Sequence, residues 1–262
     1  EFVAGISRVR QYMAHIDSER KLVASLLYDN GNVLRPDAQS ALAERMATDL
    51  VRREFEYRAI IVALYGLLEQ LFETAIERFV RQQNAIAAEY SRLPEPLQKN
   101  HLTLALGLMN KLEQSRFRDR LDIKVIISSI HSCFLGNACV LPEAFAFHTS
   151  NVRPSVVSDA LAKLGSEQFL PRLSRSFRFD APEPPPSLEA RTEGVSEAVR
   201  LVEDLATKRN EVAHGAVSEV LANSVLAPYV SATEGFGLAL CDELQLVSAI
   251  SGARYGNVLG SP

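Results

Sequence analysis

One long helical pattern, between residues 37 and 90, constrains the fold more than any other feature of the sequence. Its clearest part runs from Ile60 to Val80 and reads IIVALYGLLEQLFETAIERFV. Apolar side chains recur there at steps of three and four residues, which places them on one broad face of a helix. A face this wide is typical of the central helix of a core. Its members are Ile60, Leu64, Leu67, Leu68, Leu71, Phe72, Ala75, Ile76 and Phe79.

The rest of the chain also predicts helices, separated by short breaks that contain glycine or proline. No segment predicts a strand convincingly, so we expect an all-α fold in a single domain over residues 1–262. Residues 1–50 would be an N-terminal helical extension, and the Pro/Glu-rich residues 180–194 a linker or exposed loop. The predicted helices cover residues 3–28, 37–90 (as two helices or one bent helix), 96–113, 121–136, 154–164, 194–214 and 219–250.

The composition excludes several classes of protein. Hydrophobic residues make up 47% of the chain and charged residues 23%, which is typical of a globular protein. The net charge of -4 gives no global basic field, so nucleic acid would have to bind a local patch. Three cysteines without C-x-x-C spacing predict neither a disulfide framework nor a zinc site. We expect a cytoplasmic protein without a membrane span.

The segment KRNEVAHG, from Lys208 to Gly215, places polar residues where a helix is ending. Arg209 falls near the middle of the apolar face of that helix. Burying an arginine unpaired costs several kcal/mol. Arg209 is therefore expected to pair with a carboxylate, to extend to solvent, or to face an interface or cleft that needs a cation.

Asn210 and His214 are spaced i, i+4 on an adjacent face of the same helix. About 140° separates Arg209 from His214 on an ideal helix, so the two converge only if the arginine reaches round or the helix unwinds. Gly215 offers such an end because glycine readily takes the left-handed conformation. An arginine can bind a phosphate bidentately, and a histidine can move its protons near neutral pH. RNA supplies its own 2′-hydroxyl nucleophile, so this chemistry requires no metal and no cofactor.

The R-x4-H spacing by itself is weak evidence for a functional site. A second copy, RQYMAH from Arg10 to His15, lies on a flank of the first predicted helix without a glycine after it. We interpret this second copy as a chance occurrence at the surface.

The wider context of the motif resembles the HEPN superfamily, whose RNase members carry R-x4-6-H with a polar residue, often Asn, after the arginine. LVEDLATKRNEVAHG matches this pattern through Arg209, Asn210 and His214. The segments ALYGLLEQLFETAIERFV, LPEPLQKNHLTLALGL and NVRPSVVSDALAKLG also resemble stand-alone bacterial HEPN proteins, including relatives of the RiboL-PSP-HEPN group. The resemblance covers residues 55 to 250, and only the Arg-Asn-His motif in it is specific.

The resemblance implies a HEPN-like helical bundle that forms a homodimer through the motif face, so that two motifs share one cleft. It also implies a metal-independent endoribonuclease that leaves 2′,3′-cyclic phosphate ends on tRNA or mRNA. The usual settings are antiviral (phage) defence, RNA processing and toxin–antitoxin systems with a cognate inhibitor. Arg209 would hold the phosphate, His214 would transfer protons, and Asn210 would orient the histidine or the phosphate by hydrogen bonding. The alternative is a non-catalytic helical module that binds a nucleotide or a partner protein.

Further residues are candidates for supporting roles. Glu69, with Tyr65 one turn away, could orient Arg209 across the core, or could lie on a solvated flank. Lys208 could attract phosphate beside the motif. Three arginines interleaved with phenylalanines could grip single-stranded RNA, or their segment could simply pack into the core. These arginines are Arg172, Arg175 and Arg178.

Overall fold

The computed structural model describes residues 1–28, 36–112, 121–147, 151–176, 188–215 and 222–256. These residues form helices and no strand, which confirms the all-α prediction. The only pairing of extended backbone among them is an isolated bridge between Glu89 and Asn137. The elements are α1 (Phe2–Tyr28), α2 (Pro36–Ala47), α3 (Asp49–Ala87), the 3-10 turn η1 (Tyr90–Arg92), α4 (Glu95–Met109), α6 (Ile123–Phe134), α7 (Pro142–Ala146), α8 (Pro154–Lys163), α9 (Phe169–Ser176), α10 (Leu188–Ala213) and α11 (Asn223–Gly256).

The predicted helices agree with the observed ones except around α10. Residues 180–194 were expected to form a loop, but α10 begins at Leu188. The stretch LEARTE that opens it consists mostly of good helix formers, and they outweigh the cost of Gly194, about 1 kcal/mol inside a helix. Residues 180–187 lie outside the described part of the chain. The five-residue helix α7 was not predicted because it is too short to show a hydrophobic period. The helix α9 was also not among the predicted helices.

The chain divides into two compact units. The first comprises Glu1–Leu68 with Glu197–Glu234, and the second comprises Glu69–Ser196 with Gly235–Pro262. The helices α3, α10 and α11 each contribute to both units. The expected single domain over residues 1–262 therefore stays a prediction.

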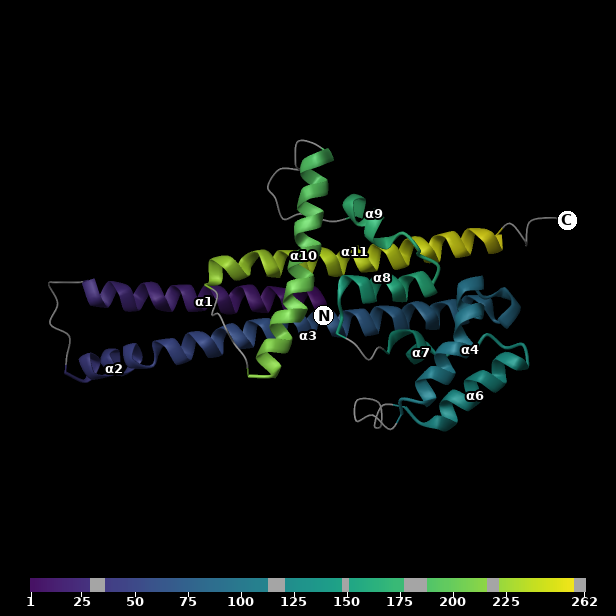
Figure 1. Cartoon of the computed structure of the whole chain (residues 1–262), viewed down its shortest axis with the longest axis horizontal. Coiled ribbons are helices and arrows are strands. Elements are labelled where there is room, and N and C mark those ends of the chain that lie inside the picture. Colours follow the sequence, from purple (N-terminus) through teal and green to yellow (C-terminus); the bar gives the residue numbers. More distant parts are fainter. Residues whose placement is uncertain (29–35, 113–120, 148–150, 177–187, 216–221, 257–262) are drawn as a thin grey trace. The chain divides into compact units, whose positions relative to one another are not determined.

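The first unit contains α1, α2, the N-terminal half of α3, most of α10 and the start of α11. Within it, α1 lies beside α3, and α10 crosses α3 at a steep angle (Figure 1). The core takes one apolar face from each of the long helices, including Ile6 and Ile16 of α1 and Leu205 of α10. Asn223 at the start of α11 donates hydrogen bonds to the Met13 carbonyl and to the carboxylate of Asp17, which ties α11 to α1.

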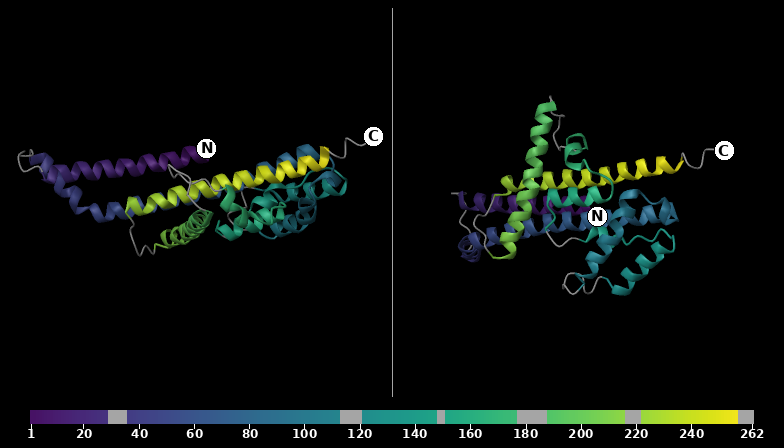
Figure 2. Two further views of the ribbon diagram at one scale, coloured as in Figure 1. Left: turned by 90° about the horizontal axis from the view of Figure 1, so that it is seen from above. Right: turned by 45° about the vertical axis from the view of Figure 1, so that its right-hand side comes forward.

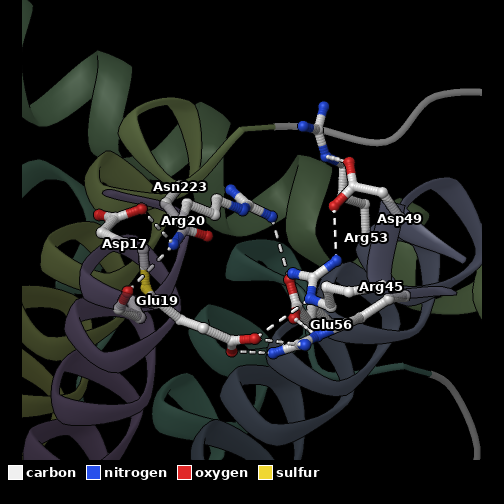
Figure 3. Close-up of polar contacts among 10 residues, drawn as sticks. Asp17, Glu19, Arg20, Arg45, Asp49, Arg53, Glu56 and Asn223 are labelled. Atoms are coloured by element: carbon white, nitrogen blue, oxygen red, sulfur yellow. Dashed lines mark hydrogen bonds and ion pairs between the residues drawn. The ribbon is translucent and has the colours of Figure 1, made fainter. Parts of the chain in front are cut away.

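Ion pairs also join α1 to α3 in the first unit (Figure 3). The Glu19 carboxylate of α1 accepts from Arg52 of α3, and also from Arg45 of α2 at 3.2 Å. The Glu56 carboxylate of α3 is buried and accepts from Arg20 of α1 at 3.0 Å and from Arg52 at 2.8 Å. These pairs hold α1 on α3, alongside the apolar contacts of the same two helices.

The second unit contains α4, α6, α7, α8 and α9, with the remaining parts of α3 and α11. Helix α4 packs against α6, α7 and α8, and the four helices cluster in both views of Figure 2. Gly165 ends α8 as predicted, with φ +104°, and an added Cβ would lie 3.2 Å from Pro96. The ring of Phe169 on α9 meets Phe236 of α11 edge to face, with centroids 5.6 Å apart.

The central stripe of α3 lies in the core, as the sequence predicts. Six members of the predicted stripe are buried, and three are half-buried. The buried ones are Ile60, Leu64, Leu68, Phe72, Ile76 and Phe79, and the half-buried ones are Leu67, Leu71 and Ala75. By length and composition alone, α3 is apolar enough to cross a membrane, and 39% of its most apolar 18-residue stretch is buried. A core helix passes the same test, so this composition does not by itself indicate a membrane span.

Candidate functional site

Arg209 lies on the ring of Tyr65. The guanidinium carbon is 5.0 Å from the ring centroid, within the range of a cation–π contact. Tyr65 comes from α3 and is only 2% exposed, whereas Arg209 is half-buried. No carboxylate pairs with Arg209 among the residues that the structure describes. The arginine predicted to interrupt an apolar face is therefore accommodated by an aromatic ring, and its charge is not neutralised there.

Asn210 links the three residues of the motif. Its side-chain oxygen accepts a long hydrogen bond of 3.4 Å from Nη1 of Arg209. Its backbone carbonyl accepts from the backbone N–H of His214 at 3.0 Å. Asn210 thus contacts the arginine through its side chain and fixes the last helical turn below the histidine.

His214 is exposed and follows the last helical residue, Ala213. Gly215 comes next with φ +73°, the left-handed conformation expected of a residue that ends a helix. Its N–H donates to the carbonyl of Val212 at 3.2 Å. Nothing lies within 4 Å of a Cβ built at Gly215, so the requirement for glycine there is conformational rather than steric. The predicted helix end is confirmed, and it leaves the imidazole open to solvent.

Lys208 has a carboxylate partner. Its Nζ lies 3.5 Å from Oδ2 of Asp204, one turn earlier on α10, and its side chain is largely buried. The hydroxyl of Tyr229, on α11, donates to the same Oδ2 at 2.5 Å. Burial and this contact with Asp204 raise the pKa of Tyr229 above its usual range. Lys208 is therefore held on its own helix, and its contact with phosphate stays a prediction.

Asp204 and Tyr229 were not among the site residues predicted from the sequence. The i, i+4 spacing of Asp204 and Lys208 is a detectable signal for the first, since such pairs face each other on a helix. No local pattern links Tyr229 to α10, because the contact depends on how two helices pack.

The other supporting candidates fall in the second unit. Glu69 is half-buried and is the first residue of the second unit, whereas Arg209 belongs to the first unit. Its pairing with Arg209 therefore stays a prediction. Arg172 donates at 3.0 Å to Glu243, a buried carboxylate of α11 that also accepts from Ser166. This ion pair holds α9 on α11 and gives Arg172 a structural role. Arg175 lies on α9 with an undescribed side chain, and Arg178 lies outside the described residues. RNA binding by these arginines stays a prediction.

The second copy of the spacing lies in a different environment. Nη2 of Arg10 is 2.6 Å from Oε2 of Glu234, so this arginine is neutralised by an ion pair. His15 is exposed in the middle of α1, far from a helix end. The two R-x4-H copies share a spacing, but their arginines have different partners. Only the copy at Arg209 lies at the end of a helix.

No group of three or more His, Cys, Asp or Glu side chains that could hold a metal ion occurs within the described residues. His101, in the second unit, is buried and accepts a hydrogen bond at Nε2 from the Leu141 N–H at 3.2 Å. Desolvation lowers the pKa of His101 to about 4. This histidine is thus a neutral acceptor that fixes the backbone before α7.

The chain belongs to the RiboL-PSP-HEPN family, whose sequence model matches residues 40–245. The matched range includes Arg209, Asn210 and His214 and leaves out α1. No curated protein and no solved structure matches the chain. Membership of this family, together with the all-α fold, supports a function of the HEPN type, which in many members is RNA cleavage.

Proposed function

We propose that this protein is a metal-independent endoribonuclease of the HEPN type. The observation that carries the proposal is the state of Arg209. Its guanidinium has no carboxylate partner among the described residues and lies half-buried on Tyr65, near a helix end with an exposed histidine. An arginine that serves only to stabilise a helical core would be expected to find a carboxylate, as Arg10 and Arg172 do.

In the proposed reaction the 2′-hydroxyl oxygen of RNA attacks the adjacent phosphorus. A bond forms between these two atoms, and the bond from phosphorus to the 5′-oxygen breaks. Arg209 binds the phosphate and stabilises the charge that develops on it. His214 transfers a proton, either from the attacking hydroxyl or to the leaving 5′-oxygen. Asn210 orients the arginine through its side-chain oxygen. The products are a 2′,3′-cyclic phosphate and a 5′-hydroxyl.

We further propose that two copies pair through the motif face. The first unit carries an exposed apolar stripe on α3, formed by Val51, Phe55 and Val62, which are 71%, 69% and 50% exposed. On an ideal helix these positions lie within about 80° of Tyr65, on the same side of α3. Exposed apolar side chains that share a face commonly mark an interface. Pairing there would bring two motifs to one cleft.

The setting of the activity is also a proposal and rests on the family alone. A cytoplasmic role in antiviral defence or in a toxin–antitoxin system accords with HEPN membership. In that setting the substrate is tRNA or mRNA, and a cognate inhibitor protein restrains the enzyme.

The test is cleavage of total tRNA and mRNA by the purified protein in EDTA. The wild type is expected to cut RNA and to leave cyclic-phosphate ends, whereas Arg209→Ala and His214→Ala should lose cleavage and keep their helical content. His15→Ala, in the second copy of the spacing, serves as the matched control and should cut at the wild-type rate. Wild-type cleavage by either motif variant would refute the assignment.

The alternative is a non-catalytic module that binds a nucleotide or a partner protein through the same residues. The intact motif and the unpaired charge of Arg209 favour catalysis. Absence of cleavage by the wild type, together with tight binding of a nucleotide that Arg209→Ala abolishes, would favour the alternative.

A further inference from the structure

The second unit contains a groove between α3 and α11 that lies outside the proposed nuclease motif. It has a volume of about 530 Å³ and is lined by one face of each helix. The two helices run in the same direction there (Figure 1), and Gln83 of α3 donates to the hydroxyl of Ser248 on α11 at 3.2 Å. Cavities that bind small molecules commonly have volumes of about 300–1,000 Å³. The groove is therefore large enough for a small ligand.

Arg78 is the charged residue that lines this groove. It makes no hydrogen bond, ion pair or ring contact within the described part of the chain. Every other arginine whose side chain the structure describes has at least one such contact. Even Arg81, one turn further along α3, pairs with Glu77 and Glu143. The guanidinium of Arg78 thus offers two parallel donors to a ligand.

The walls of the groove are mainly apolar. Leu71, Phe79 and Leu244 supply apolar surface from both helices, and no carboxylate lines the cavity. The amides of Gln82 and Gln245 also line it, and neither makes a hydrogen bond within the described residues. The groove therefore combines an apolar body, one cation and two amides that can donate.

We propose that this groove binds a small amphipathic anion. The carboxylate or phosphate head pairs with Arg78, and the amide of Gln245 or Gln82 donates to it. The apolar part lies between Phe79 and Leu244. This combination of an apolar wall with a few polar groups that fix the orientation is typical of ligand sites. The proposal concerns residues outside the motif and does not rest on ribonuclease activity.

The test uses the fluorescent anion 8-anilinonaphthalene-1-sulfonate, with the uncharged N-phenyl-1-naphthylamine as its neutral counterpart. The wild type should bind the anion saturably. Arg78→Gln should weaken that binding about tenfold or more, because a charge-assisted pair is lost. Gln245→Glu, at an exposed position, should weaken it similarly by placing a negative charge beside the head. Neither variant should change binding of the neutral dye.

Arg81→Gln is the matched control, since it removes an arginine from the same helix outside the groove. It should bind the anion like the wild type. Displacement of the anion by sodium decanoate would assign an acyl-chain ligand, and displacement by AMP would assign a nucleotide. Failure of both to displace it, absence of saturable binding, or equal affinity in the wild type and both groove variants would overturn the proposal.

Discussion

Two arginines with the same spacing to a histidine show how the surroundings decide what a residue can do. Arg10 meets the carboxylate of Glu234, so its charge is neutralised within the chain. Arg209 meets the ring of Tyr65, which attracts the cation through its quadrupole and leaves the guanidinium donors available. The aromatic contact therefore positions Arg209 without removing its ability to bind phosphate.

Replacing Tyr65 should separate the effect of the ring from that of the hydroxyl. Tyr65→Phe keeps the ring and should cleave RNA near the wild-type rate. Tyr65→Leu removes it and should lower the rate about tenfold, since a desolvated cation–π contact is worth up to about 2 kcal/mol. The cleavage rates are measured in single-turnover reactions with an RNA that the wild type cuts. Melting temperatures of the variants are recorded in parallel. Equal rates for Phe and Leu would contradict a positioning role for the ring.

His101 predicts a pH dependence of stability. Folding lowers its pKa from 6.5 to about 4, so the folded state favours the neutral imidazole, which accepts the Leu141 N–H. The contribution is therefore complete above pH 6.5 and is lost as the pH falls from 6.5 towards 4. Between pH 7 and pH 5 the loss should be about 2 kcal/mol.

Urea unfolding at the two pH values measures this loss, with His101→Gln as the control. Glutamine does not titrate, and its side-chain oxygen can accept the same N–H. The variant should lose about 2 kcal/mol less stability than the wild type over this range. A wild-type curve that matches the variant at both pH values would show that another group titrates.

The ion pairs between α1 and α3, which Figure 3 draws, involve two carboxylates that differ in burial. The side chain of Glu56 is 6% exposed, whereas that of Glu19 is 25% exposed. Glu56→Gln leaves Arg20 and Arg52 beside a neutral amide in a buried place and should cost about 2 kcal/mol. Glu19→Gln should cost at most about 1 kcal/mol, because this carboxylate is more exposed than that of Glu56 and water screens its pairs more strongly.

Urea unfolding followed by circular dichroism would compare the two variants, first at low salt and then in 1 M NaCl. High salt should abolish the effect of Glu19→Gln and retain most of that of Glu56→Gln. Equal costs for the two substitutions, or equal screening by salt, would show that burial does not set the strength of these pairs.

Most helices could be predicted from the sequence because their signals are local. The stripe from Ile60 to Phe79 repeats at helical spacing and does lie in the core. Gly165 and Gly215 take the left-handed conformation at predicted helix ends. The start of α10 could not be predicted in the same way. The helix propensity of residues 188–193 favours a helix, whereas their Pro/Glu-rich neighbours favour a loop.

The sequence could predict that Arg209 needed a partner, but not which one. Tyr65 was a candidate only through its spacing from Glu69, and its stacking on Arg209 depends on the crossing of α10 over α3. The hydrogen bond from Tyr229 to Asp204 has the same origin, because it joins α11 to α10. Contacts between distant helices leave no periodic signal in a single sequence.

The division of the chain into two units assigns the two proposed sites to different units. Arg209, Tyr65 and His214 belong to the first unit, and the groove around Arg78 belongs to the second. The family match spans residues from both units and begins after α1. The helix α1 is thus an addition to the matched region, and buried residues such as Ile6 and Ile16 make it part of the core of the first unit.

The proposed homodimer can be tested at Phe55. Phe55 is 69% exposed on α3 and lies on the same side of that helix as Val62 and Tyr65. Phe55→Glu would place a buried charge in an interface formed there, so it should convert a dimer into a monomer. The same variant should lose RNA cleavage, because the composite cleft needs a motif from each copy.

Light scattering after size exclusion, together with the cleavage assay, would test both effects. Phe134→Glu is the matched control, since Phe134 is a phenylalanine of the second unit that is 76% exposed on α6. It should leave the mass and the cleavage rate unchanged. A wild-type monomer that cuts RNA would show that one motif suffices for catalysis. A dimer that persists in Phe55→Glu would place the interface on another surface.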